Sequence, residues 1–104
     1  MPLTRSFKET VQQRARSDAQ FRVELFRGAL ECMLEGDLEA GKRLLRDYIN
    51  ATVGFDAVAE HLAKNPKSVM RMLSPSGNPR AENLFGIITH LREKEGIKFE
   101  LTAS

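Results

Sequence analysis

The sequence contains a single cysteine, Cys32, and no apolar run that approaches the roughly 20 residues needed to span a bilayer. An internal disulfide is therefore excluded, and a membrane-spanning helix is not expected. The N-terminal stretch 1–10 also lacks the apolar core of a secretory signal. These absences together predict a soluble protein that works in the cytoplasm.

Strong charge of one sign is also missing. The 104 residues carry 16 lysines and arginines against 14 aspartates and glutamates, for a formal net charge of +2. This mildly basic balance is compatible with nucleic-acid binding but does not establish it, so the placement of the cations matters more than their number. The length suits one domain with a modest core, and a large cleft between two domains is not expected.

Residues typical of catalysis are few and scattered. His61 and His90 are far apart in the sequence, both are expected on exposed helix sides, and neither belongs to a metal-binding spacing. Cys32 lies on an apolar helix side with no histidine nearby in the sequence, which favours an inert buried thiol over a nucleophile. We therefore expect a protein that is not an enzyme and that holds no cofactor or metal ion.

Capping residues and glycines bracket nearly every periodic segment, which predicts a mostly helical chain. Ser6 with Glu9, and Ser17 with Gln20, fit the capping box at two helix starts. Gly36 suits the left-handed turn that closes a helix. The expected helices cover about 6–16, 18–35, 37–53, 55–62, 65–73 and 78–96.

These elements group into three parts. The first is an N-terminal helical arm over 1–36, and the second is a helix-turn-helix DNA-binding domain over 37–96. The third, 97–104, begins with alternating apolar and charged residues from Ile97 to Leu101, a pattern typical of a strand. A lone strand has no partner in its own chain, so we expect it to pair between subunits or with a partner protein. The alternative is a tail that packs Phe99 back on the core.

The segment from Phe55 to Ser74 predicts the helix-turn-helix. Two short helices joined by a tight turn can place the second helix in the major groove of DNA. The turn, Ala63-Lys64-Asn65, lacks the usual glycine, so Ala63 or Asn65 must take the left-handed conformation. The expected packing face is made by Val58, Ala59 and Leu62 on the first helix and by Val69 with Met72 or Leu73 on the second.

The second helix of this pair presents polar and basic side chains on its other side. Arginine can bond guanine with two hydrogen bonds, and Arg71 is the first choice for base readout. For the charges alone, an ordinary solvated helix face is the alternative. The expected base contacts are Asn65, Lys67, Ser68 and Arg71, and the expected phosphate contacts are Lys64 and Arg80.

The second helix of the arm is apolar on more than one side. Phe26 and Leu30 fall on one side at 100° per residue, and Phe21 and Leu25 fall on another. The spare side is either an interface or a surface held between the first helix and the DNA-binding core. The expected partner or dimer interface comprises Phe21, Leu25, Ile97, Phe99 and Leu101.

About two-thirds of the chain, from Leu34 to Leu101, resembles a known family. The resemblance lies in the segments 35–37, 54–55 and 66–73 and in the Gly77-Asn78-Pro79 loop. On these residues the chain is similar to the Cro-like (XRE-type) helix-turn-helix antitoxins of type II toxin–antitoxin modules, the addiction-module antidote proteins related to HigA. The resemblance implies an all-α, lambda-repressor-like bundle that represses its own operon and neutralises a RelE/HigB-like toxin.

The function expected from the sequence is therefore sequence-specific repression of transcription, by a homodimer that binds a double-stranded DNA operator and doubles as an antitoxin. One alternative is a phage- or plasmid-type regulator that has no toxin partner. The other is a protein-interaction module in which the helix-turn-helix serves only as scaffold.

Overall fold

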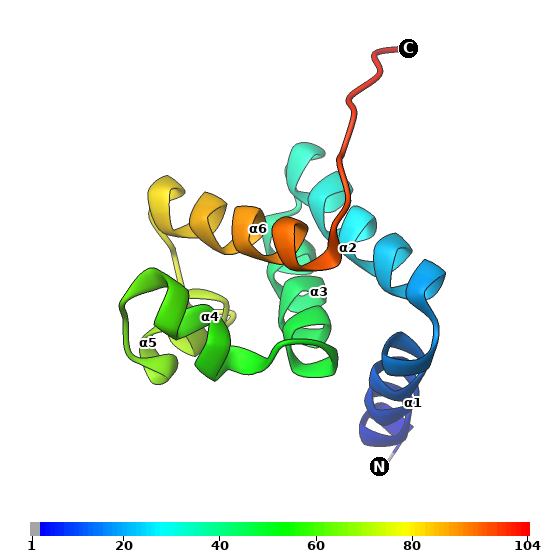
Figure 1. The fold of residues 1–104 in the computed structure, drawn as a ribbon, viewed down its shortest axis with the longest axis horizontal. Helices are drawn as coiled ribbons and strands as arrows, with labels where there is room; N and C mark the ends of the chain where they lie inside the picture. The colour runs from blue at the N-terminus through cyan, green and yellow to red at the C-terminus, as the bar shows by residue number, and fades with distance from the viewer. Residues whose placement is uncertain (1–2) are drawn as a thin grey trace.

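The computed structural model describes the backbone of residues 3–104, with the side chains of Phe7 and of every residue from 9 onward. Every regular element in this range is a helix, which confirms the predicted all-α class. Figure 1 shows α3 at the centre, with α1 and α2 on one side and α4 and α5 on the other; α6 runs from the side of α4 and α5 across α3 toward α2. The helices are α1 (Leu3–Ser17), α2 (Ala19–Leu34), α3 (Leu38–Ala51), α4 (Gly54–Leu62), α5 (Pro66–Met72) and α6 (Ala81–Glu95).

Two predicted helix starts were wrong in detail. Helix α1 begins at Leu3, so Ser6 lies inside it and cannot be its N-cap. Ser17 ends α1, and its hydroxyl donates back to the carbonyl oxygen of Gln13 at 3.3 Å. Asp18 is the N-cap of α2 instead, because its carboxylate accepts from the N–H of Phe21 at 3.1 Å and a negative charge is favourable at a helix start.

Two boundaries also differ in the second half of the chain. Helix α3 ends at Ala51, where the hydroxyl of Thr52 donates to the carbonyl oxygen of Tyr48 at 2.7 Å. Helix α6 was expected to open at Asn78-Pro79 but begins at Ala81, because Arg80 is still extended, with φ −65° and ψ 150°. The segment between α5 and α6 is therefore longer than predicted.

The core forms where α2, α3 and α6 meet. Phe26 of α2 is fully buried and stacks on Tyr48 of α3, with ring centroids 4.9 Å apart. Val58 and Val69 extend the same buried cluster into α4 and α5. The arm and the remainder of the chain thus share one core.

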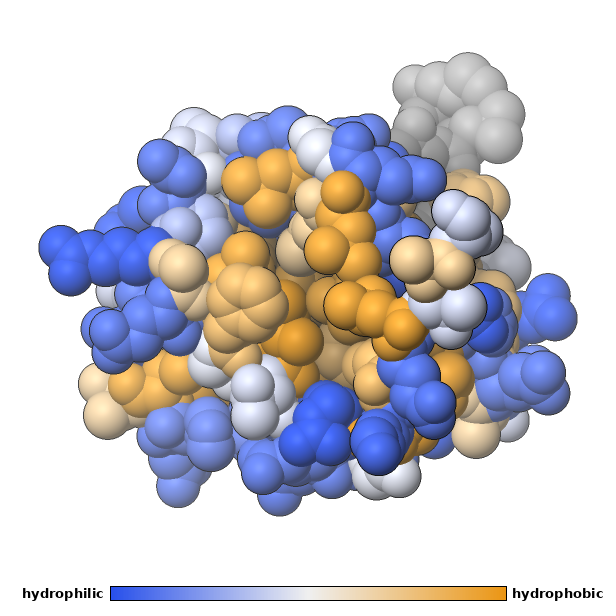
Figure 2. Space-filling model, turned by 90° about the horizontal axis from the view of Figure 1, so that it is seen from above, coloured by the Kyte–Doolittle hydropathy of each residue, from blue (hydrophilic) through white to orange (hydrophobic). Residues whose placement is uncertain are grey.

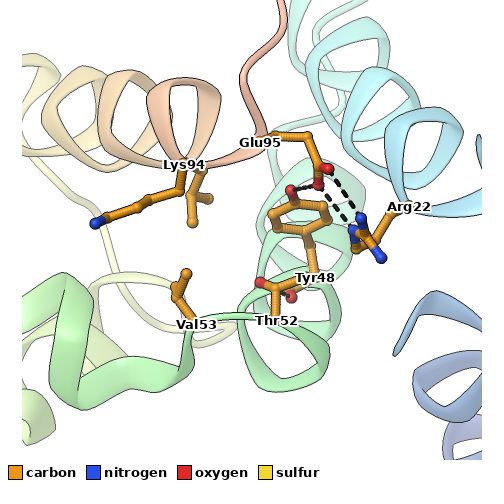
Figure 3. A pocket seen from close by; sticks show the side chains of 7 residues that line it. Arg22, Tyr48, Thr52, Val53, Lys94 and Glu95 are labelled. Carbon is orange, nitrogen blue, oxygen red and sulfur yellow. Dashed lines mark hydrogen bonds and ion pairs between the residues drawn. The ribbon is translucent and has the colours of Figure 1, made fainter. Parts of the chain in front are cut away.

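An ionic cluster ties α2, α3 and α6 together at the edge of this core (Figure 3). Arg22 donates from Nε and Nη2 to the two carboxylate oxygens of Glu95, at 3.0 and 3.1 Å. The hydroxyl of Tyr48 donates to the same carboxylate. Burial acts to raise the pKa of Glu95, but the hydrogen bonds from Arg22 and Tyr48 outweigh it and hold that pKa below its usual value. Burial and the hydrogen bond to Glu95 raise the pKa of Tyr48.

The C-terminal segment is extended but forms no strand within residues 3–104, so the predicted strand is not confirmed in the single chain. The physical reason is that a strand requires hydrogen bonds to a neighbour, and the described elements are all helices. Ile97 and Phe99 are half-buried against the core, and the rings of Phe99 and Phe26 pack nearly perpendicular, with centroids 5.1 Å apart. Leu101 is 84% exposed, and the segment leaves the bundle beside α2 (Figure 1).

None of the described helices is both long enough and apolar enough to cross a membrane.

Candidate nucleic-acid interface

Helices α4 and α5 and the turn between them are held together by a shared apolar contact. Val58 and Ala59 of α4 and Val69 of α5 are buried, as is Leu73 directly after α5. Ala63 closes α4 in the left-handed conformation, with φ 55° and ψ 45°. The structure thus assigns to Ala63 the unusual turn conformation that the sequence required of Ala63 or Asn65.

Ala63→Gly is expected to stabilise the protein. A β-carbon in the left-handed region costs roughly 1–2 kcal/mol, and glycine removes this strain from the folded state. Part of the gain is lost, because glycine also makes the unfolded chain more flexible. The expected gain is about 0.5–1 kcal/mol in the free energy of unfolding, measured by urea denaturation. A matched Ala57→Gly change within α4 should instead destabilise by about 1 kcal/mol. A lower free energy of unfolding in Ala63→Gly would contradict the assignment of a strained left-handed conformation to Ala63.

Helix α5 presents most of the predicted base-reading residues to solvent. Asn65 is its N-cap and accepts from the N–H of Lys67 at 2.8 Å, so the Asn65 carboxamide oxygen already has a partner. Lys67 and Arg71 are exposed, and Ser68 is half-buried. Ser68 and Arg71 border an open hollow of about 410 Å³ that reaches the loop at Asn78. The structure therefore brings Ser68 and Arg71 to one concave surface.

The cations around α5 are exposed and are not interrupted by acids. Residues 61–81 contain Lys64, Lys67, Arg71 and Arg80 and no aspartate or glutamate, whereas the rest of the chain carries more acidic than basic residues. All four side chains are exposed. Although the net charge of the chain is only mildly positive, its positive charge is concentrated in residues 61–81.

Two residues of α3 that the sequence analysis missed hold the loop after α5. Lys42 is fully buried, and its Nζ donates to the carbonyl oxygens of Ser74 at 3.0 Å and Gly77 at 2.7 Å. Arg46 donates to the carbonyl oxygen of Leu73. A signal was present, because Lys42 precedes the buried Leu45 by one helical turn and so lies on the apolar side of α3.

Gly77 allows the loop to approach α5 closely. A β-carbon at this position would lie 2.1 Å from the carbonyl oxygen of Arg71 and 2.5 Å from that of Met72. Both contacts are far too short for any side chain, and both are to backbone. Only glycine therefore fits at position 77 with this arrangement of α5 and its loop.

The two histidines were predicted to be separate and both exposed, which was right for the exposure of His61 and wrong for the other two points. His61 of α4 is exposed, but His90 of α6 is 6% exposed, and their rings stack with centroids 4.2 Å apart. They meet because α4 packs on α6, which the linear sequence does not reveal. In the described part of the chain His90 Nε2 has no hydrogen-bond partner, and no group of three or more potential metal ligands occurs.

The buried histidine makes stability depend on pH. Burial, and then repulsion from His61 and Lys94, lower the pKa of His90 from 6.5, against a smaller opposing effect of Glu93. Below about pH 6.5 the unfolded chain binds the proton first, so stability present above that pH is lost as the pH falls through the folded-state pKa.

We expect His90→Gln to flatten this slope between pH 7 and pH 5, measured as the free energy of unfolding in urea. His61→Gln is the matched control and should leave most of the slope in place, because His61 is exposed. An unchanged slope in His90→Gln would contradict the assignment to His90.

The predicted interface residues lie in two different places. Phe21 is half-buried under the Arg14 guanidinium, 4.9 Å from its ring centroid, and Leu25 packs on the core. Neither lines the groove where the C-terminal residues lie. That groove, of about 650 Å³, brings Ile97, Phe99 and Leu101 together with the α2 residues Val23, Leu30 and Leu34, which the sequence analysis did not include in the interface.

Comparison with known proteins found no matching family model, no matching curated protein and no matching solved structure.

Proposed function

We propose that this chain is a sequence-specific DNA-binding regulator of transcription with a lambda-repressor-like arrangement of helices, and that α5 is its reading helix. The observation that supports this most directly is the exposed set of cations on and around α5, in a segment without acidic residues. Guanine edges accept two hydrogen bonds from arginine, and phosphates attract lysine and arginine at any sequence. In this proposal Arg71 reads a base, and Lys64 and Arg80 hold the backbone.

The packing that holds α5 in place also supports the proposal. Base readout requires side chains held at fixed positions on a rigid support. The shared packing of α4 and α5 holds one side of the helix, and the loop after it is tied to α3 by the buried Lys42. Helix α5 and the loop after it are therefore fixed relative to α3 and α4.

The test is a fluorescence-anisotropy titration of DNA from immediately upstream of the gene, against random DNA, at two salt concentrations. Arg71→Ala is expected to lose about 1–3 kcal/mol of discrimination between the two DNAs. Lys64→Ala should weaken binding to both alike and reduce the salt slope by about one unit. Arg43→Ala, at an exposed arginine of α3, is the matched control and should change neither quantity.

Equal affinity of the wild type for both DNAs would reject sequence-specific regulation. Complete absence of DNA binding, with a folded chain, would leave the alternative of a protein-interaction module that uses this segment as scaffold.

The antitoxin role rests on the sequence resemblance of residues 34–101 alone. It predicts a small RelE/HigB-like reading frame beside the gene, whose toxicity is relieved when this chain is co-expressed. A neighbouring toxin that co-expression fails to neutralise would leave a regulator without a toxin partner, and the DNA-binding proposal would stand unchanged.

A further inference from the structure

The C-terminal tail, residues 97–104, stands beside α2 and leaves an apolar groove open between them. Leu34 at the end of α2 is 70% exposed and Leu101 of the tail is 84% exposed, and both line the groove. Figure 2 views the molecule from the side toward which the tail points and shows hydrophobic side chains gathered around a hollow. Exposed apolar surface of this kind is typical of an interaction site.

One edge of the tail has free backbone groups. The N–H of Ile97 donates to the carbonyl oxygen of Arg92 at 3.3 Å, and the carbonyl oxygen of Ile97 accepts from Arg92 Nη1 at 3.1 Å. In an extended segment the backbone groups of successive residues point to alternate edges, so those of Lys98 and Glu100 point away from Arg92. Within the structure as described, no backbone group of residues 98–104 has a hydrogen-bond partner.

The side chains of the tail alternate as they would in a half-buried strand. Ile97 and Phe99 turn toward the core, and Lys98 and Glu100 are exposed. Such a segment, with a free edge and one apolar face, is a template for pairing with another extended chain.

We propose that the tail of a second copy of this chain pairs with it, antiparallel, about a two-fold axis at Phe99. In this register Lys98 of each copy faces Glu100 of the other, so two opposite-charge pairs form on the exposed face. A two-fold axis one residue earlier would bring the two copies of Lys98 together, and one residue later the two copies of Glu100. Charge complementarity therefore selects this register, and a second copy supplies both of the charges that it requires.

The hydrogen-bonding pattern agrees with the same register. When the two copies of Phe99 form a non-hydrogen-bonded pair, Lys98 and Glu100 of the opposite copy exchange both N–H···O bonds. These bonds use only backbone groups that are free in the single chain. If the Phe99 pair were hydrogen-bonded instead, Ile97 would have to release Arg92.

Pairing in this way also covers the exposed apolar residues. In an antiparallel pair centred on Phe99, Leu101 of one copy lies opposite Ile97 of the other, on the same face of the ribbon. Each exposed Leu101 is thereby brought over the groove of the second copy, which Ile97 and Leu34 help to line. The apolar groove that is exposed in the single chain is then covered by the same region of the second copy, as a two-fold interface requires.

The test is sedimentation equilibrium of the full chain, without DNA, over a range of concentrations. The wild type is expected to dimerise, and Lys98→Glu and Glu100→Lys should each raise the dimer dissociation constant about tenfold or more, because like charges replace both pairs. An equimolar mixture of the two variants should associate again, since the introduced glutamates then face the introduced lysines. The double variant Lys98→Glu/Glu100→Lys should recover the wild-type dissociation constant for the same reason.

Arg43→Glu makes the same charge change at an exposed residue of α3 and should leave the dimer unaffected. A wild type that stays monomeric at every concentration would overturn the proposal, and so would a dimer indifferent to the tail variants or variants that do not associate on mixing. This test does not depend on the proposed DNA binding, because it measures association of the chain in the absence of DNA.

Discussion

Lys42→Met is expected to lower the free energy of unfolding by about 2–4 kcal/mol and to loosen the loop that follows α5. Methionine keeps the apolar stem of the side chain but removes the ammonium group that bonds the carbonyl oxygens of Ser74 and Gly77. An acceptor left unpaired on burial costs roughly 1–3 kcal/mol. Glu39, the ion-pair partner 2.9 Å from Lys42 Nζ, is exposed and can return to water, so it adds little.

Urea denaturation checks the loss of stability, and amide hydrogen exchange locates it. Exchange should rise in residues 71–79 more than in α2, because the loop is tied to α3 through Lys42. Arg43→Met removes an exposed cation from the next position and is the matched control, with an expected change within about 0.5 kcal/mol. A Lys42 variant as stable as this control would show that the buried ammonium does not hold the loop.

Glu95→Ala is expected to destabilise the protein by about 2–4 kcal/mol, which is the second large effect. Its carboxylate joins Arg22 of α2 to Tyr48 of α3, so the change leaves a partly buried guanidinium and a buried hydroxyl without their acceptor. Removing one partner of such a cluster costs more than the net contribution of the intact pair, because the other charge stays behind. Replacing Arg22 as well, in Arg22→Met/Glu95→Ala, should recover part of the loss.

Thermal or urea unfolding measures this effect, and Glu93→Ala, at an exposed residue two positions earlier, should be nearly neutral. The stabilisation by Glu95 should also depend on pH. Its pKa is lower in the folded chain than the usual 4.5, so its contribution is present above about pH 4.5 and is lost as the pH falls through the folded-state pKa. A double variant no more stable than Glu95→Ala would argue against a stranded charge as the cause.

Features that depend on neighbours in the sequence were predicted well. The helical class, the short pair over 54–72 and the turn at 63–65 follow from caps, glycines and apolar spacing, which act within one or two turns. The inward side of α5, with Val69, and the outward Lys67 and Arg71 follow from the same periodicity. The sequence left Ala63 and Asn65 as the two candidates for the left-handed conformation, and the structure assigns it to Ala63.

Features that depend on which helices pack against each other were missed or mistaken. Lys42 is on the apolar side of α3 in the sequence, but only the loop after α5 explains why a lysine is buried there. His61 and His90 stack because α4 and α6 cross, although 28 residues separate them in the chain. The capping box predicted at Ser6 was wrong because a capping residue does not prevent the helix from extending upstream, and α1 begins at Leu3. The one predicted at Ser17 was wrong because the next residue, Asp18, is a better hydrogen-bond acceptor and caps α2.

By itself the sequence determined the helical class, the turn before α5 and the cations that surround it, since each depends on residue type and short-range spacing. Tertiary structure alone decided that Arg22, Tyr48 and Glu95 form one cluster across three helices and that the tail remains an open edge beside α2. The physical reason is range: caps and periodicity act over a few residues, whereas burial, ion pairing and free edges depend on segments that only the folded chain brings together.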